Sequence, residues 1–151
     1  MTTADLTPVT IERVMTTMSS HGVELTQAEE RAVAHANLNG LSVTFALLGS
    51  VLIVRAEADS GLETKTADAT WYLAANHLNS VTLGARAVIV DAFDTLVMRT
   101  ERSLPVAAGL SDAQLADGLR YCVDQVVGTH DALRTVAEQF LEQLGAPDAE
   151  A

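Results

Sequence analysis

The sequence predicts an α+β fold: a single domain in which about five antiparallel strands form a sheet with helices packed on it. Apolar and polar residues alternate along 41–47, which is the pattern of a half-buried strand. The strand candidates are joined by short turns, which pair strands antiparallel. A capped run with helical periodicity follows Ser111. The expected order is helix, three strands, helix, two strands and a long helix.

The first helix is predicted to begin at Thr7, a capping residue, with Pro8 at the first helical position. Gly22 is placed to end it in a left-handed conformation. The apolar face of this helix consists of Ile11, Val14, Met15 and Met18.

Three strand candidates follow the polar stretch 26–30, and they form an antiparallel meander. The first is 31–38, which ends in Asn39-Gly40, a strong hairpin signal. The second is 41–47, and Gly49-Ser50 turns the chain into the third, 51–58, which is rich in β-branched residues.

The second half of the chain begins where Asp59-Ser60-Gly61 interrupts the strand pattern. A helix is expected from 66 or 67 to 78, and Asn76 and Asn79 could satisfy the carbonyl groups at its end. A hairpin of 86–90 and 95–100 follows, with its turn at 91–94.

The last helix has the clearest signals in the chain. Ser111 and Gln114 form a capping box, and Leu110 and Leu115 occupy the positions of a hydrophobic staple. Gly128 favours a kink or break in the middle of the helix. The apolar stripe consists of Leu115, Leu119, Cys122, Val126, Leu133, Ala137, Phe140 and Leu144. On the opposite side, Asp117, Asp124, Asp131 and Glu138 predict a solvated face paired with Arg120 and Arg134, or alternatively an acidic docking surface.

The composition excludes several classes of function. The chain has 151 residues, 48% of them hydrophobic, and a net charge of −11 from 20 acidic and 9 basic residues. Lys65 is the only lysine, and no run of basic residues occurs. Binding to nucleic acid or to an anionic membrane needs clustered positive charge, so neither partner is expected.

The chain also lacks the signals of export and membrane insertion. Its first residues have no basic region and no apolar core, so no signal peptide is expected. The longest apolar stretch, 41–58, is interrupted by polar and charged residues and cannot span a bilayer. Cys122 is the only cysteine, and its place on an apolar stripe predicts a buried, unreactive thiol. We therefore expect a cytoplasmic protein.

No pattern of catalytic or ligand-binding residues stands out. The histidines His21, His35, His77 and His130 lack the spacing of a zinc site, and glycine-rich phosphate loops and nucleophile elbows are absent from the sequence. Asp91 and Asp94 flank a turn, where aspartate commonly bonds its own backbone. No catalytic residue, cofactor or metal is predicted, and the protein is not expected to be an enzyme.

Two segments carry a resemblance to a known family. Trp71 with Asn76-His77-Leu78-Asn79, and then the stretch 105–115 (PVAAGLSDAQL), resemble the YbjN-type domain, which carries only the general label of a bacterial sensory-transduction regulator. The resemblance covers 8–144 as one domain, leaving 1–7 and 145–151 as flexible tails. It implies a fold like that of type III secretion chaperones, commonly a homodimer, and it implies no catalytic residues.

The expected function is a noncatalytic protein-binding or regulatory module, similar to a chaperone or adaptor, with the alternative of a small-molecule sensor that uses a pocket on the sheet face. The expected partners are a second copy of the chain and a further protein that the sequence does not identify. Depending on the register, Ala46, Leu52, Val54 and Ala56 would lie on an exposed face and favour contact with a partner. Trp71 and Leu78 are the interface candidates.

Overall fold

The computed structural model describes residues 5–145 and has an α+β fold built on one antiparallel sheet. Six strands follow the spatial order β1-β2-β3-β4-β6-β5, so β5 and β1 are the edge strands. The predicted tails, 1–7 and 145–151, lie for the most part outside the described residues. The elements in chain order are α1 (Ile11–Ser20), β1 (Thr26–Gln27), β2 (Val33–Leu38), β3 (Leu41–Leu48), β4 (Val51–Glu63), α2 (Thr70–Val81), β5 (Arg86–Ala92), β6 (Thr95–Pro105) and α3 (Asp112–Gly145).

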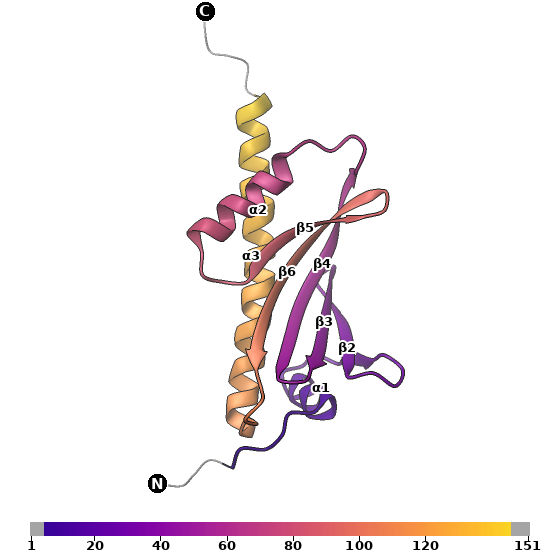
Figure 1. Ribbon diagram of the computed structural model, residues 1–151, viewed down its shortest axis with the longest axis vertical. Helices are drawn as coiled ribbons and strands as arrows, with labels where there is room; N and C mark the ends of the chain where they lie inside the picture. The colour runs from indigo at the N-terminus through magenta and orange to yellow at the C-terminus, as the bar shows by residue number, and fades with distance from the viewer. Residues whose placement is uncertain (1–4, 146–151) are drawn as a thin grey trace, which may run out of the picture.

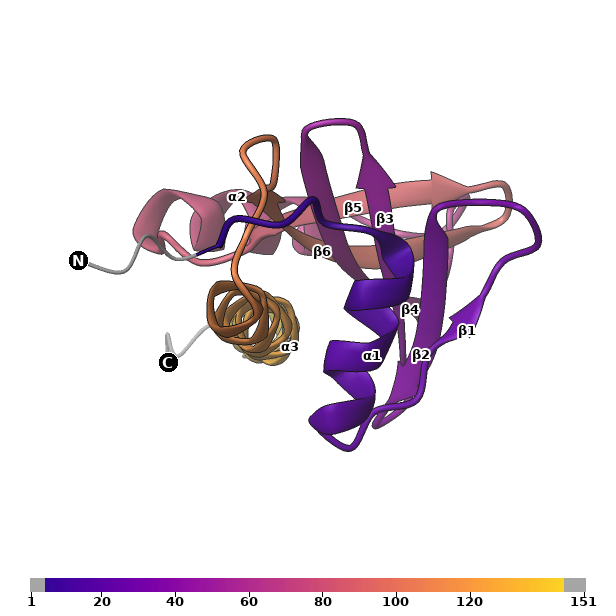
Figure 2. The ribbon, with the colours of Figure 1, turned by 90° about the horizontal axis from the view of Figure 1, so that it is seen from below.

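The helices lie on one side of the sheet, which curves around α1 and α3 (Figures 1 and 2). The long helix α3 contacts β4, β5 and β6 and also packs against α1 and α2. Helix α2 lies across α3 beside the beginning of β5 (Figure 1). We call the sheet face that carries the helices the inner face and the opposite face the outer face.

The core has two parts that meet along α3. The first lies between α1, the first half of α3 and strands β2 to β4, with Phe45 as its largest fully buried side chain. The second lies between α2, the second half of α3 and strands β5 and β6. It contains Trp71, Ala74, Ala75, Leu78, Ala87, Met98, Leu133 and Ala137.

The register of the meander decides which side chains enter the core. Phe45 pairs with Val54, and Ala46 pairs with Ile53. Because paired residues share a face, Val54 lies on the inner face with Phe45. Leu52, Val54 and Ala56 are fully buried under the helices, so the prediction that they lie on an exposed face is wrong. Ala46 lies on the outer face, as predicted, and its partner there is Ile53.

Helix α1 begins later than predicted but ends as predicted. Its cap is Thr10, whose hydroxyl accepts the N–H of Arg13 at 3.2 Å, so a helix start at Thr7 is wrong. At the other end, Gly22 has φ of +83° and donates to the carbonyl of Ser19 at 2.9 Å. Together with the bond from Val23 N–H to Met18, this is the Schellman arrangement that favours glycine.

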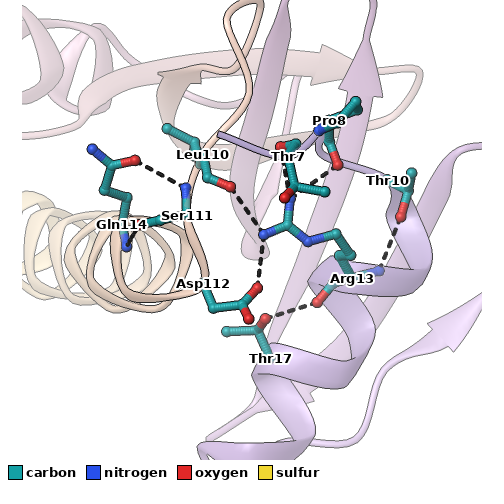
Figure 3. Close-up of polar contacts among 9 residues, drawn as sticks. All are labelled: Thr7, Pro8, Thr10, Arg13, Thr17, Leu110, Ser111, Asp112 and Gln114. Atoms are coloured by element: carbon teal, nitrogen blue, oxygen red, sulfur yellow. Dashed lines mark hydrogen bonds and ion pairs between the residues drawn. The ribbon is translucent and has the colours of Figure 1, made fainter. Parts of the chain in front are cut away.

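Thr7 instead joins the N-terminal segment to the start of α3. Its backbone exchanges hydrogen bonds with Leu110. The Arg13 guanidinium donates to the carbonyls of Thr7 and Pro8, each at 2.9 Å, and to the carbonyl of Leu110 at 3.0 Å. It also pairs with Asp112 at 2.9 Å (Figure 3). One side chain from α1 therefore holds two segments about a hundred positions apart, which is a structural role.

The strands differ from the prediction mainly in length. Two residues are too few to show a periodic pattern, so β1 is absent from the prediction. Strand β4 continues past Asp59 through an irregularity in its pairing with β6, where Gly61 adopts φ of +76°. Strand β6 extends five residues beyond the predicted end at Thr100. The Asn39-Gly40 hairpin is confirmed, with both residues at positive φ.

Helix α3 is continuous through Gly128, so the predicted break does not occur. The capping box is confirmed: Ser111 N–H donates to Gln114 at 2.9 Å, and Gln114 N–H donates to the Ser111 hydroxyl at 3.2 Å (Figure 3). On either side of Gly128, Val126 and His130 are buried, and the Val126 carbonyl accepts from the hydroxyl of Thr100 in β6 at 2.7 Å. These anchored neighbours offset the low helix propensity of glycine.

Candidate interaction surface

The outer face is the part of the sheet that no described helix covers (Figure 2). Its side chains alternate with the buried ones along β3, β4, β5 and β6. The residues that define it are Thr44, Ala46, Leu48, Val51, Ile53, Arg55, Glu57, Arg86, Val88, Arg99, Glu101 and Ser103.

A row of three charges crosses the centre of this face. Glu101 lies directly opposite Arg55 on one side and Arg86 on the other. It accepts from Arg55 at 2.9 Å and also pairs with Arg86. Burial alone would raise the pKa of Glu101, but hydrogen bonds from Arg86 and Arg55 outweigh burial and lower its pKa. One carboxylate is therefore shared by two guanidinium groups.

The neighbouring row is also an ion pair between β4 and β6, but here β4 supplies the acidic residue and β6 the basic one. Glu57 lies opposite Arg99 and accepts from its guanidinium. Strand β4 thus carries Arg55-x-Glu57, and β6 carries Arg99-x-Glu101. Because the strands are antiparallel, each Arg meets a Glu. Sequence reasoning assigned no role to these residues. The Arg-x-Glu pattern occurs within the strand candidate 51–58 and again across the end of 95–100, and this repetition was a signal for their pairing.

An apolar strip lies beside the charged rows, and Ile53 is at its centre. Ile53 lines two hollows. The smaller one, of about 120 Å³, also involves Ala46 and Leu48. The larger one is an open groove of about 560 Å³ that reaches Ser103 and Pro105 at the end of β6. Apolar side chains next to fixed charges are the composition of a surface that binds another molecule.

The outer edge of β5 is covered by a side chain of α2 instead of a further strand. The Asn79 side chain donates to the carbonyl of Ala87 at 2.8 Å and accepts its N–H at 2.9 Å. Asn79 therefore replaces a neighbouring strand at the edge of β5. The prediction that it satisfies the end of its own helix is wrong, because Thr82 donates to the Leu78 carbonyl there.

The predicted interface residues belong to the second part of the core. Trp71 is 8% exposed and Leu78 is 4% exposed, and both pack between α2, α3 and the sheet. Little of either side chain is available to a partner. Helix α2 exposes the apolar residues Tyr72 and Leu73 next to Trp71, at 47% and 54%, and Val81 at its end, at 63%.

The structure does not bring the histidines together. His21 caps α1, and His35 is exposed in β2. His77 lies on α2 with its ring 5.8 Å from that of Phe140. His130 is buried in α3. Within residues 5–145, no group of three histidine, cysteine or acidic side chains is placed to hold a metal ion.

Two buried groups in α3 have perturbed pKa values. Burial lowers the pKa of His130, and the charge of Arg134 acts in the same direction. The Nε2 atom of His130 has no hydrogen-bond partner among the described residues. Burial raises the pKa of the Cys122 thiol, which is 1% exposed, so the prediction of a buried cysteine is confirmed.

The remaining acidic candidates are exposed. Asp91 accepts from the hydroxyl of Thr64 at 2.9 Å, rather than from its own turn as predicted. The acidic stripe of α3 is exposed to solvent, as predicted. No ion pair of the described residues involves Arg120 or Arg134, so the predicted pairing along that stripe is wrong.

Comparison with known proteins yields a structural match. No family model matches the chain, and no curated protein matches it. A solved structure of YbjN from E. coli, described as "a putative transcription regulator", matches with a TM-score of 0.71 and 16% sequence identity, over 89% of this chain and 96% of that chain. No helix within residues 5–145 has the combination of length and apolarity that crossing a membrane requires. The chain therefore has the YbjN-type α+β fold that the sequence resemblance implied.

Proposed function

We propose that this protein is a noncatalytic regulatory module of the cytoplasm that binds another protein through its outer face. The observation that carries the proposal is the uncovered sheet surface around Ile53, where apolar side chains lie beside ordered charges. The description of YbjN as a regulator favours the same class of function. Whether the module acts as a chaperone or as a signalling adaptor depends on the partner.

The charge distribution supports a protein partner. The whole chain has a net charge of −11, yet Arg55, Arg86 and Arg99 lie together on the outer face with only Glu57 and Glu101 between them. This local excess of positive charge is too small for a nucleic-acid surface. It suits the selection and orientation of a protein with acidic groups next to apolar ones.

We propose further that the protein is a homodimer and that the second copy contacts α2. Tyr72 and Leu73 are adjacent, apolar and about half exposed. They follow Trp71 directly in the chain, and Trp71 and Leu78 pack α2 onto the core. An exposed apolar surface on a packed helix favours association with a second copy.

The alternative function, a small-molecule sensor, receives less support. The core covers most of the inner face in the described residues, which leaves little room there for a ligand. The groove at the end of β6 has enough volume for a metabolite, but it is open, whereas ligand sites usually enclose most of the ligand.

Capture of partners from the native cell tests the proposed function. Wild-type protein should retain one stoichiometric partner, and Ile53→Asp should lose it because a charge replaces the centre of the apolar strip. Leu141→Asp is the matched control, since Leu141 is also exposed but lies on α3. Stabilisation by a metabolite in a thermal-shift screen, with no protein retained, would favour the sensor instead.

Light scattering at micromolar concentration tests the dimer. A mass of twice the monomer's 16.0 kDa is expected, and Leu73→Glu should return it to the monomer value while leaving the circular dichroism spectrum unchanged. A wild-type mass near 16.0 kDa would contradict the proposal.

A further inference from the structure

Strand β6 extends beyond its neighbour β5 and leaves a short open edge. The pairing of β5 with β6 ends at Arg86 opposite Glu101, whereas β4 continues alongside β6 as far as Pro105. We call the segment from Arg102 to Pro105 the β6 edge. It is about 13 Å long at roughly 3.3 Å per residue, which is room for about four residues of an added strand.

The hydrogen-bond alternation of the sheet directs the backbone of Ser103 toward this open side. Val106 N–H donates to Ser50 at 2.9 Å, so the even-numbered residues of β6 bond to β4. The odd-numbered residues therefore face the side of β5, which agrees with the bonds of Ala87 to Asn79 on the far side of β5. Ser103 is odd-numbered and lies beyond the end of β5, so its N–H and carbonyl face the groove without a strand partner.

Arg102 keeps the edge open. Its guanidinium donates to the carbonyls of Leu83 and Gly84 at 3.1 and 3.0 Å and lies over the ring of Tyr121, 5.2 Å from the centroid. Gly84 packs so closely on α3 that a Cβ atom would lie 2.6 Å from the side-chain oxygen of Gln125. The segment that would otherwise extend β5 along the β6 edge is therefore held away from it.

The groove on this edge accepts a chain end and not a continuous chain. A strand added antiparallel to β6 would lie in line with β5, and β5 itself blocks its path at Arg86. An antiparallel strand would bring its C-terminal end to Arg86, and a parallel strand would bring its N-terminal amine there. The Arg86 side chain is 68% exposed, and Arg102 lines the same groove. Guanidinium groups attract a carboxylate and repel an amine.

We propose that the groove beside Ser103 binds the free C-terminal end of an extended peptide, which adds a short strand to the β6 edge and places its terminal carboxylate beside Arg86. This inference rests on the proposed protein-binding function and specifies the part of the partner that is recognised. Main-chain bonds to Ser103 supply affinity that is independent of side chains, and the carboxylate supplies selectivity for a chain end. The single carboxylate of the groove, Glu101, is already bonded to Arg55 and Arg86 and leaves the site positive.

Fluorescence anisotropy with two forms of one labelled peptide tests this inference. The probe is an N-terminally labelled tetrapeptide of alanine and valine, either with a free C-terminal carboxylate or as the C-terminal amide. The free acid should bind at least about tenfold more tightly than the amide, as one charge-assisted contact provides. Arg86→Gln should reduce binding of the acid to the level of the amide.

Two further variants separate this site from the rest of the outer face. Arg99→Gln is the matched control, because Arg99 is also an ion-paired arginine of the outer face but does not line the groove, and it should leave binding unchanged. Ser103→Pro removes the N–H at the open edge and should weaken the acid and the amide alike, whereas Ser103→Ala should weaken neither. If Ser103→Pro does not fold, Arg86→Gln and Arg99→Gln still decide the outcome.

Equal binding of acid and amide, equal losses in Arg86→Gln and Arg99→Gln, or no binding of the acid at about 1 mM would each overturn the inference.

Capture of the protein partner tests the proposed function separately from the peptide site. A protein partner that Ile53→Asp loses and Arg86→Gln retains would leave the protein-binding function standing without this site. If the wild-type protein binds neither the acid peptide nor a protein partner, both the peptide site and the proposed protein-binding function are contradicted.

Discussion

The two faces of the sheet are held by different forces. On the inner face, Phe45, Val54 and Met98 are buried under helices, and burial of apolar surface determines their pairing. On the outer face, Glu101 and Glu57 pair with arginines from neighbouring strands while remaining within reach of water. Burial therefore selects which face of each strand turns inward. Charge then favours one register among those that keep the same face inward, because a slip of β6 by two residues would place like charges opposite each other.

The largest difference between the faces should appear when a side chain is truncated. Phe45→Ala leaves a cavity in the first part of the core and should lower the free energy of unfolding by about 3–5 kcal/mol. Ile53→Ala, at the neighbouring position on the outer face, should cost about 1 kcal/mol or less because Ile53 is only half-buried. Urea unfolding measures both. Equal losses would show that another molecule covers the outer face under the conditions of the measurement.

The free energy of unfolding should also depend on pH, because His130 is buried in α3 on the side of the inner face. Its pKa in the folded protein lies below the ordinary value of 6.5, so the unfolded chain binds a proton that the folded chain does not. Stability should be fully present above pH 6.5 and fall as the pH decreases below that value. His130→Met should remove this dependence in urea unfolding at pH 5.5 and 7.5.

The outer face supplies the control for that experiment. His35 is exposed in β2, and His35→Gln should preserve the pH response of the wild-type protein. If His35→Gln abolishes the response and His130→Met does not, the titrating group lies on the outer face instead.

The two charged rows should differ from each other. Glu101→Gln leaves Arg55 and Arg86 without their common carboxylate and should cost about 1–2 kcal/mol. Glu57→Gln affects only Arg99 and should cost about 0.5 kcal/mol. Chemical unfolding of the two variants checks the order. A larger loss in Glu57→Gln would show that sharing one carboxylate between two arginines adds nothing.

A small effect is also expected at the start of the helix that covers the inner face. Ser111→Ala removes the side chain that accepts the Gln114 N–H at 3.2 Å and should cost about 1 kcal/mol. Thermal unfolding detects a loss of this size. Ser111→Asp keeps an acceptor at the cap and should restore most of the stability. An unchanged midpoint in Ser111→Ala would mean that Arg13 and Asp112 alone hold this end of α3.

Local sequence signals predicted those features that depend only on a short segment of the chain. The capping box at Ser111, the hairpin at Asn39-Gly40 and the end of α1 at Gly22 each depend on a few adjacent residues, and each is confirmed. The start of α1 was misplaced for the opposite reason. Thr7 has the chemistry of a helix cap, but its backbone pairs with Leu110, which lies about a hundred residues away.

The candidate surface was predicted only in its general character. The sequence indicated that apolar side chains would remain on an open sheet face, but it placed Leu52, Val54 and Ala56 there. The register of β3 against β4 decides this question, and alternation alone leaves the choice between the two faces open. The ionic row of Glu101 was missed because it requires β4 and β5 to lie on the two sides of β6.

The sequence by itself determined the class of the fold, the order of its main elements, the end of α1 and the start of α3, because periodicity, caps and turns act over a few residues. The predicted bounds of α2, from 66 or 67 to 78, are wrong, since this helix spans Thr70–Val81. Only the tertiary structure decided that β6 lies between β4 and β5, that Asn79 closes one edge, and that the edge at Ser103 stays open. These features arise from contacts between residues far apart in the chain. Their energies depend on which segments meet, and no local pattern contains that information.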